Sequence, residues 1–361
     1  MEGIHPRVPS GEPGHRQLLG EGVVHLDDVC LVTGGAGFIG ANLVHALLRQ
    51  SMRVRVFDDL STGHLDNLAD LGERVEFVRG DVRDEEAVRA AAQGAAVVFH
   101  LAAMTSEAAS VADPVAAHAI NATGTLHVLL GARDAGCQRV VVASSAEVYG
   151  DQDPVALSEE LPAWPMTPFA ASQLAAERYA TAFYYAYALP TVSLRFFNVY
   201  GPRERIDGEG GVVAAFIRAV LEGHPMSIEG DGEQARDLVH VGDAVQALLL
   251  ASDVTPDAFG GVFNVGVGDR HTVAQLAATL TSLAAELELG PVPAPVHVPG
   301  RPGDLPRRQA DVREAERVLG FSPEYGFEDG LRRTLQWFAE RGTTGAAGSG
   351  VRVVPPGGGP G

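Results

Sequence analysis

A short apolar segment that runs directly into a glycine-rich turn constrains the fold of this chain more than any other feature. Val29–Thr33 has the composition of a buried strand, and Phe38–Gln50 has the apolar periodicity of a helix. Between them, Gly34, Gly37 and Gly40 follow the spacing G-x-x-G-x-x-G. In such a turn the first glycine permits the tight bend, the second lets a pyrophosphate approach the backbone, and the third lets helix and strand pack closely. The segment therefore predicts a dinucleotide-binding strand, turn and helix.

An acidic residue after the next expected strand indicates which dinucleotide is bound. Arg53–Phe57 alternates like a strand, and Asp58 follows it directly. A carboxylate at this place accepts hydrogen bonds from an adenosine ribose and repels the 2′-phosphate of NADP. The glycine spacing alone is a weak signal, but its position between a strand and a helix, with this acid downstream, is specific. We therefore expect NAD as the cofactor.

Strand and helix signals alternate along most of the chain. This alternation predicts an α/β fold, a Rossmann-type doubly wound parallel sheet with a smaller C-terminal substrate-binding cap. The expected strands are Val29–Thr33, Arg53–Phe57, Val75–Val78, Ala96–Leu101, Arg139–Ala143, Thr191–Phe196, Met226–Ile228 and Val262–Val265. The expected helices are Phe38–Gln50, Asp84–Ala92, Pro114–Ala135, Pro168–Tyr187, Val212–Glu222, Val241–Ser252, Asp311–Leu319 and Phe327–Glu340.

Composition along the chain divides it into a body with two loose ends. Residues 1–28 and 342–361 are rich in glycine and proline, so we expect a disordered N-terminal extension and a flexible tail. The NAD-binding domain is expected to cover 29–200 and about 233–265. The cap takes 201–232 and 266–341, with a proline-rich loop at 291–306. No internal repeat is present.

The charge balance excludes several classes of partner. The chain has 46 acidic and 27 basic residues, for a formal net charge of −19. Such a surface repels nucleic acid and anionic membranes, so we expect neither as a partner. The two cysteines, Cys30 and Cys137, have no metal-binding spacing, and no signal peptide or long apolar span is visible. We expect a cytoplasmic protein without a metal.

Further motifs resemble the extended short-chain dehydrogenase/reductases, in particular the NAD-dependent nucleotide-sugar epimerases and dehydratases that are similar to UDP-glucose 4-epimerase. They include Gly80-Asp81-Val82, His100-Leu101-Ala102-Ala103, the Asn121 segment and Ser144-Ser145-Ala146-Glu147-Val148-Tyr149-Gly150. The resemblance extends from about Val29 to Trp337. The cofactor-binding residues that it implies, with those predicted above, are Gly34, Gly37, Phe38, Ile39, Gly40, Asp58, Asp59, Ser61, Thr62, Gly63, Asp81, Val82, Leu101, Ala102, Ala103, Asn121 and Gln173.

Three downstream sequence motifs are typical of the nucleotide-sugar branch of that family. They are Arg195-Phe196-Phe197-Asn198-Val199-Tyr200-Gly201-Pro202, Gly230–Asp237 and Arg301-Pro302-Gly303-Asp304. The resemblance implies that an asparagine and two arginines hold the diphosphate of a UDP- or dTDP-sugar, and guanidinium groups suit phosphate oxygens. Surface salt bridges with neighbouring aspartates are the alternative role for the two arginines. The substrate-binding residues expected are Ser106, Ser145, Asn198, Val212, Arg236, Arg301 and Asp304.

The chain departs from the family at the catalytic pair. Phe169 stands where the family has a tyrosine that removes a hydroxyl proton, and Gln173 stands where it has a lysine that lowers the pKa of that tyrosine. Phenylalanine has no ionisable group, and glutamine brings no charge, although it can hydrogen-bond a ribose hydroxyl. The usual mechanism therefore cannot run, and losing such a group typically costs about 10²–10⁴ in rate.

Three interpretations of this departure stay open. In the first, the protein is an enzyme with a relocated base, and Glu147 is the leading candidate. Ser145 occupies the position of the family's active-site serine or threonine. Tyr149, His100 and Glu107 are weaker candidates for the base. In the second, it binds NAD and a sugar nucleotide without turnover, as a pseudoenzyme or partner subunit. In the third, the chemistry needs no tyrosine. The resemblance also implies a homodimer built from the helices Pro114–Ala135 and Pro168–Tyr187.

Overall fold

A parallel sheet forms the centre of the protein, as the alternation of strands and helices predicts. The computed structural model describes residues 28–152, 156–207, 210–300, 307–341 and 353–354. Every pairing in the sheet is parallel. Its order is β12 (Gly261–Val265), β7 (Thr191–Phe196), β5 (Arg139–Ser145), β4 (Ala95–His100), β1 (Val29–Thr33), β2 (Arg53–Asp58) and β3 (Val75–Arg79). The order reverses between β1 and β4, which is where doubly wound folds bind their ligands.

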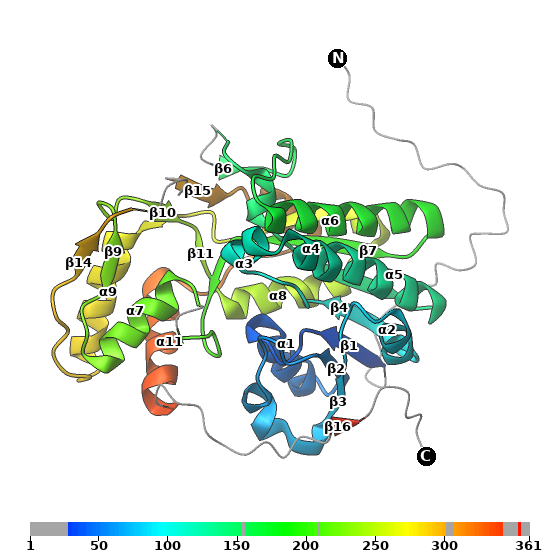
Figure 1. Ribbon diagram of the computed structural model, residues 1–361, viewed down its shortest axis with the longest axis horizontal. Coiled ribbons are helices and arrows are strands. Elements are labelled where there is room, and N and C mark those ends of the chain that lie inside the picture. Colours follow the sequence, from blue (N-terminus) through cyan, green and yellow to red (C-terminus); the bar gives the residue numbers. More distant parts are fainter. Residues whose placement is uncertain (1–27, 153–155, 208–209, 301–306, 342–352, 355–361) are drawn as a thin grey trace.

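Helices cover both faces of this sheet (Figure 1). One face carries α2 (Glu85–Ala92), α5 (Gly124–Asp134) and α6 (Pro168–Tyr187), and the other carries α1 (Phe38–Arg49), α8 (Val241–Ser252) and α10 (Arg313–Leu319). Successive strand residues serve opposite faces: Leu31 belongs to the first core and Val32 to the second. The strands read as continuous apolar runs because both of their faces are buried.

A smaller cap lies beside the sheet, on the left in Figure 1. Its core is formed mainly by α7 (Val212–Glu222), α9 (Val273–Glu286) and α11 (Phe327–Arg341). A four-stranded sheet of β13 (His271–Thr272), β10 (Ala235–Arg236), β15 (Arg307–Ala310) and β6 (Ala156–Leu157) borders the body. Two short pairs complete it: β8 (Asn198–Tyr200) with β11 (Leu238–His240), and β9 (Ser227–Glu229) with β14 (Val296–Val298).

The structure differs from the sequence prediction in several elements. The expected single helix over 114–135 is split into α4 (Pro114–Ala117), the π-helical turn η2 (His118–Thr123) and α5, because η2 carries Asn121 into side-chain hydrogen bonds. The expected loop at 291–306 contains β14. Helix α10 packs into the main core, although its sequence was placed in the cap. The helical elements that the sequence did not predict are η1 (Leu65–Arg74), α3 (Glu107–Ala112), η3 (Ala146–Tyr149) and η4 (Pro256–Ala258). The short strands β6, β8, β10, β11, β13 and β15 were not predicted either.

Both ends of the chain lie largely outside the described residues, and so does the predicted disorder of 1–28 apart from its last residue. Within the expected flexible tail, β16 (Val353–Val354) pairs in parallel with β3, at the edge of the sheet (Figure 1). In the part of the chain that is described, no helix is long and apolar enough to cross a membrane. The same residues form no cluster suited to a metal ion.

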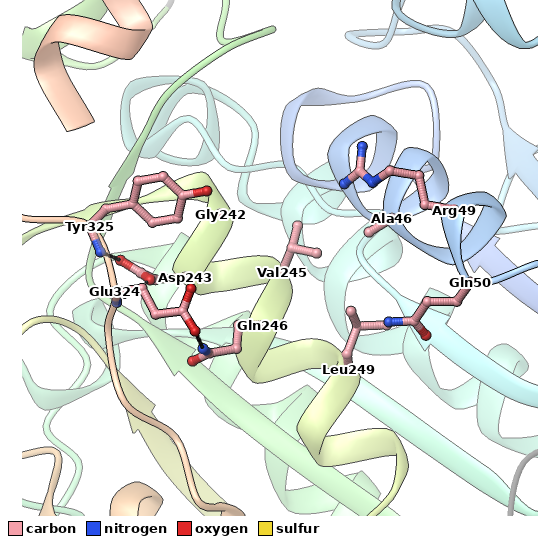
Figure 2. A pocket seen from close by; sticks show the side chains of 10 residues that line it. All are labelled: Ala46, Arg49, Gln50, Gly242, Asp243, Val245, Gln246, Leu249, Glu324 and Tyr325. Carbon is pink, nitrogen blue, oxygen red and sulfur yellow. Dashed lines mark hydrogen bonds between the residues drawn. The ribbon is translucent and has the colours of Figure 1, made fainter. Parts of the chain in front are cut away.

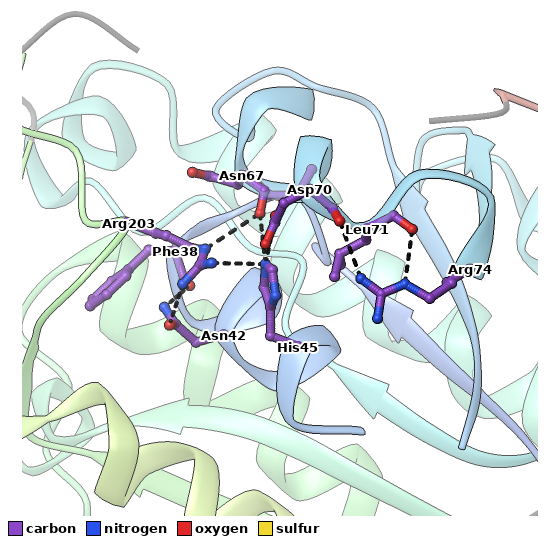
Figure 3. A network of polar contacts seen from close by, with 9 residues as sticks. Phe38, Asn42, His45, Asn67, Asp70, Leu71, Arg74 and Arg203 are labelled. Atoms are coloured by element: carbon purple, nitrogen blue, oxygen red, sulfur yellow. Dashed lines mark hydrogen bonds and ion pairs between the residues drawn. The ribbon is translucent and has the colours of Figure 1, made fainter. Parts of the chain in front are cut away.

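A polar network ties the first helix of the body to the segment that leads into the cap (Figure 3). Arg203 follows β8 and donates to His45 Nε2 at 2.9 Å and to Asn42 Oδ1 at 3.2 Å, both on α1. Asn42 in turn donates to the carbonyl of Pro202 at 2.8 Å. Burial and the Arg203 charge lower the pKa of His45, so its ring is neutral and accepts this bond. We call these contacts the Arg203 latch.

Candidate functional site

The glycine turn has the geometry of a dinucleotide cradle. Gly34 has a φ of +68°, and a Cβ placed there would lie 2.7 Å from the backbone nitrogen of Ala102. A Cβ on Gly40 would overlap the carbonyl oxygen of Gly34. Gly37 begins the first turn of α1, whose N–H groups and dipole favour a phosphate. Because these glycines have no side chains, β1, α1 and the end of β4 can approach one another closely. The resulting backbone turn fits the pyrophosphate of NAD.

Asp58 lies at the end of β2, as the sequence predicts, and is buried. Its carboxylate accepts hydrogen bonds from the backbone N–H of Ala36 at 3.0 Å and of Leu60 at 2.8 Å. Burial raises the pKa of Asp58, while these two donors oppose the rise. The carboxylate therefore fixes the glycine turn against the β2 exit and has lone pairs left for a ribose.

The other expected cofactor residues border the same edge of the sheet. A Cβ on Gly63 would lie 2.9 Å from the carbonyl carbon of Ala36, so the segment with Asp59, Ser61 and Thr62 returns to the glycine turn. Asp81 follows β3 and holds Arg83, which lowers the pKa of the carboxyl. The remaining expected cofactor residues on this edge are Phe38, Ile39, Val82, Leu101, Ala102 and Ala103.

Asn121 is a buried brace within the site. Its Oδ1 accepts from the backbone N–H of Met104 at 2.7 Å, and its Nδ2 donates to Ser172 Oγ at 2.9 Å. Ser172 lies on α6, directly before Gln173. The brace thus fixes the loop after β4 against the helix that carries the substituted catalytic pair.

Phe169 and Gln173, which the sequence analysis placed at the catalytic positions of the family, lie in the first turns of α6. Each of the two residues is 5% exposed. The Gln173 amide has no hydrogen-bond partner among the described residues, so it can bind a ribose hydroxyl. Neither side chain can accept a proton near neutral pH.

Glu147 is held at the end of β5 by a residue that the sequence analysis did not single out. Arg308, on β15, places Nη1 2.5 Å from Glu147 Oε1 and donates Nη2 to the carbonyl of Gly150 at 3.3 Å. Arg308 is 6% exposed, and Glu147 remains accessible. Ser145 starts the same turn and accepts from the Glu147 N–H at 3.1 Å. A basic residue four positions after the end of the Arg-Pro-Gly-Asp motif was the available signal.

Two of the weaker candidate bases are excluded by their surroundings. His100 is buried between the hydroxyls of Thr33 and Thr125, and burial lowers its pKa to about 4. Tyr149 is also buried, and its hydroxyl lies 2.7 Å from Asn264 Oδ1. Burial raises the pKa of Tyr149 to about 12. Both residues are therefore structural, because neither can exchange a proton with a substrate near neutral pH.

Glu107, the third weaker candidate, is close to Glu147. It lies on α3, and its carboxyl is within hydrogen-bonding reach of Glu147 and of the Thr167 hydroxyl. Burial of this carboxyl, and then the charge of Glu147, raise the pKa of Glu107. Ser106, next to it, caps α3 by accepting from the Ala109 N–H.

Basic side chains line up across the small sheet beside Glu147. The strand register places Arg236 directly opposite His271 on one side and Arg308 on the other. Opposite residues on neighbouring strands point to the same face, so the two arginines form a cationic pair. His271 lies beside this pair, and burial lowers the pKa of its ring. Asn198 and Val212 begin β8 and α7 at the cap side. Arg301 and Asp304, also expected at the diphosphate, lie outside the described residues.

A separate cavity lies beside the C-terminal end of α1, away from the glycine turn (Figure 2). It encloses about 300 Å³ between α1, α8 and the segment with Glu324 and Tyr325. None of its lining residues belongs to the cofactor or catalytic groups described above. It therefore does not change the location of the site.

Together, the doubly wound sheet, the glycine cradle and the smaller cap define a Rossmann-type protein of the extended short-chain dehydrogenase/reductase class. The family model described as the NAD dependent epimerase/dehydratase family matches residues 30–266. The chain belongs to this NAD-dependent family of nucleotide-sugar enzymes, which confirms the predicted fold class, family and cofactor.

The chain matches its relatives over almost their full length. A UDP-glucose 4-epimerase of Mycolicibacterium smegmatis is 38% identical over 86% of this chain and 98% of its own. The structure of a Thermotoga maritima UDP-glucose 4-epimerase with UDP-glucose has a TM-score of 0.81 and 35% identity, covering 86% of this chain and 99% of its own. A Thermus thermophilus UDP-glucose 4-epimerase complex with NAD has a TM-score of 0.76 and 36% identity, over 86% and 98%.

Proposed function

We propose that this protein acts on a UDP- or dTDP-type nucleotide sugar by epimerase or dehydratase chemistry, with Glu147 as the proton acceptor in place of the family tyrosine. One observation carries this proposal: an accessible carboxylate is held by a buried arginine at the end of β5, where Phe169 leaves the usual position without a base. A site that only bound ligands would have no need of an oriented carboxylate there.

The cofactor residues have separate tasks. The glycine cradle would hold the pyrophosphate of NAD, Asp58 its adenosine ribose, and Gln173 the ribose on the nicotinamide side. When bound, NAD supplies the hydride acceptor for oxidation of a sugar carbon. The protein has to provide the proton acceptor for the hydroxyl on that carbon.

Arg308 prepares Glu147 for that task. The ion pair fixes the direction of the Glu147 carboxylate, and the part of this carboxylate that stays accessible can meet the sugar hydroxyl. The hydroxyl of Ser145, which starts the same turn, would donate to the sugar oxygen. On the same sheet, Arg236 is the residue suited to the diphosphate, with Asn198 and Val212 at the cap side.

The test is proton NMR of a panel of sugar nucleotides incubated with the protein and NAD in D₂O. We expect a changed sugar, or deuterium incorporated into one, and this product identifies the reacting carbon. Glu147→Gln should lower turnover by about 10²-fold or more while NAD affinity stays unchanged. Glu160→Gln, at an exposed glutamate, is the matched control.

Two results would contradict the proposal. Unchanged turnover in Glu147→Gln would remove that residue from the chemistry. An unaltered panel at every enzyme concentration, with sugar nucleotides that still raise the melting temperature, would instead establish a pseudoenzyme that binds NAD and a nucleotide sugar.

We also infer a cytoplasmic homodimer. Val111 and Val115 are 63% and 77% exposed near the start of the α3–α5 segment, and Tyr179 and Tyr185 on α6 are 41% and 57% exposed. Apolar residues on two neighbouring helices suit a helical interface with a second copy. Val115→Glu should shift sedimentation from dimer to monomer. The two cysteines are free and buried, which suits a reducing compartment.

A further inference from the structure

We propose that the C-terminal segment Val353–Val354 is an edge guard, which occupies the outer edge of β3 and keeps β3 of a second copy of this chain from pairing there. This role does not depend on the proposed function, because it concerns the association of the chain and not turnover. It gives a task to a tail for which composition indicates only flexibility.

Without the tail, β3 would be the last strand of the parallel sheet. Its neighbour within the body is β2, on one side only. A strand with a single neighbour presents a row of unpaired N–H and C=O groups, which can template another strand. Phe77 of β3 is buried in the core on one face of the sheet, and Val78 in the core on the other. The edge therefore lies between two apolar layers, and such edges are prone to pair with another chain.

The tail supplies a strand for this edge (Figure 1). Val353 lies opposite Phe77 and Val354 opposite Val78, in a parallel pairing. In the sequence these two valines end the segment Val351-Arg352-Val353-Val354, and Pro355-Pro356 follow directly. β-branched residues favour strands, and proline has no N–H with which to continue a ladder. The tail therefore adds a strand at the centre of β3 and stops it at once.

The shortness of the added strand suits it to a guard. A very short edge strand and prolines at the edge are two of the ways in which proteins prevent edge-to-edge pairing. β16 has two residues and is followed by two prolines, so it covers β3 and offers little edge of its own. A longer terminal strand would only have moved the exposed edge outward.

The tail is an addition to the fold that this chain shares with its relatives. The UDP-glucose 4-epimerases of Mycolicibacterium smegmatis and Thermotoga maritima are matched over 98% and 99% of their own length, but each match covers only 86% of this chain. The resemblance in the sequence ends at about Trp337, near the end of α11, and residues 342–352 join α11 to β16. Removal of the tail should therefore leave the cofactor cradle and the cap intact.

Two unguarded copies can join β3 to β3. A two-fold axis brings the same edge of both copies together, so their strands run antiparallel. In a pairing centred on Phe77, Val75 would lie opposite Arg79. Glu76 would lie opposite Val78, so no like charges would meet across the new ladder. The net charge of −19 opposes association, and salt screens this repulsion.

The test compares the full chain with two truncated chains by hydrogen exchange and analytical ultracentrifugation at 0.15 M salt, roughly the physiological ionic strength. One chain ends at Arg341 and lacks the guard, and the matched control ends at Pro356 and keeps it. At low protein concentration, we expect the amides of 75–79 to exchange about 10-fold faster or more in the chain that ends at Arg341. At higher concentration its average mass should rise toward about twice that of the full chain. The control should match the full chain, and equal NAD affinity in all three shows that the body is folded.

A full-length variant separates the pairing from the mere presence of the tail. Val353→Pro/Val354→Pro removes both N–H groups of β16, so it should behave like the chain that ends at Arg341. The ultracentrifugation is repeated in the Val115→Glu background, which removes the contribution of the helical interface inferred above.

Three results would overturn the guard. The first is exchange of the 75–79 amides at the same rate with and without the tail. The second is a chain ending at Arg341 whose mass does not change with concentration. The third is protection in the full chain that is lost on dilution, because the strand on the edge would then come from a second copy.

Discussion

The candidate site has two halves: one is formed by backbone at the glycine turn after β1, and the other by side chains at the end of β5. On the β1 side, the cradle consists of backbone, and its glycines are required because a Cβ would meet Ala102 or the Gly34 carbonyl. On the β5 side, the site consists of side chains, and those of Phe169 and Gln173 carry no ionisable group. A site built from backbone has little freedom to vary, whereas a site built from side chains can change its chemistry and keep its shape.

The largest expected effect is on the cradle, with Gly34→Ala. Its Cβ would lie 2.7 Å from a backbone nitrogen at a φ of +68°. We expect NAD affinity to fall by at least about 100-fold and the free energy of unfolding to fall by about 3 kcal/mol or more. Calorimetric titration with NAD and denaturant unfolding measure the two effects.

Gly320→Ala is the matched control for that substitution. Gly320 also has a positive φ, of +70°, with a ψ of 20°, but its Cβ would meet nothing within 4 Å. Only the cost of the left-handed conformation remains, about 1 kcal/mol, and NAD affinity should not change. Equal losses in the two variants would show that the cradle is not sterically determined.

The next effect tests whether the side-chain half can be exchanged back. In the triple variant Glu147→Gln/Phe169→Tyr/Gln173→Lys, the tyrosine and lysine of the family return while the proposed base is removed. We expect turnover to recover about 10²-fold over Glu147→Gln alone, because the lysine lowers the pKa of the new tyrosine. The same NMR assay measures it. No recovery, with NAD still bound, would mean that the shape of this half has changed as well.

The smallest effect concerns Glu204, a buried carboxyl in the segment between β8 and α7. Its Oε1 accepts from the Gly211 N–H at 2.8 Å, and burial raises its pKa to about 7. The folded state therefore holds this proton more tightly than the unfolded state, so stability is full below about pH 4.5 and is lost as pH rises through about 7. Glu204→Gln should raise the free energy of unfolding by about 1–3 kcal/mol at pH 8 and hardly change it at pH 5. Equal effects at both pH values would contradict this assignment.

The sequence predicted the backbone-built half well, because that half follows from local patterns. The strand Val29–Thr33, the turn and the acid Asp58 were each visible in consecutive residues, and the parallel sheet followed from the alternation. The π-helical turn at Asn121 was not visible, because it depends on hydrogen bonds to Met104 and Ser172, far along the chain.

The side-chain half could be predicted only in part. The sequence located Phe169, Gln173 and Glu147, since each lies in a recognisable phrase. It could not show that Glu147 meets Arg308, which is 161 positions later and arrives through the pairing of β15 with β10. The sequence also could not show that the side chains of His100 and Tyr149 are buried, because burial comes from tertiary packing.

The Arg203 latch has a consequence for how strongly two ligands bind to this protein together. It joins α1, which begins at the cofactor cradle, to the segment that leads into α7 of the cap. Under the proposed function, NAD bound at the cradle would restrict α1 and, through the latch, the segment that enters the cap. Each ligand would then reduce the conformational freedom that the other has to restrict. Such coupling is reciprocal: the factor by which NAD tightens nucleotide-sugar binding must equal the factor by which the sugar tightens NAD binding.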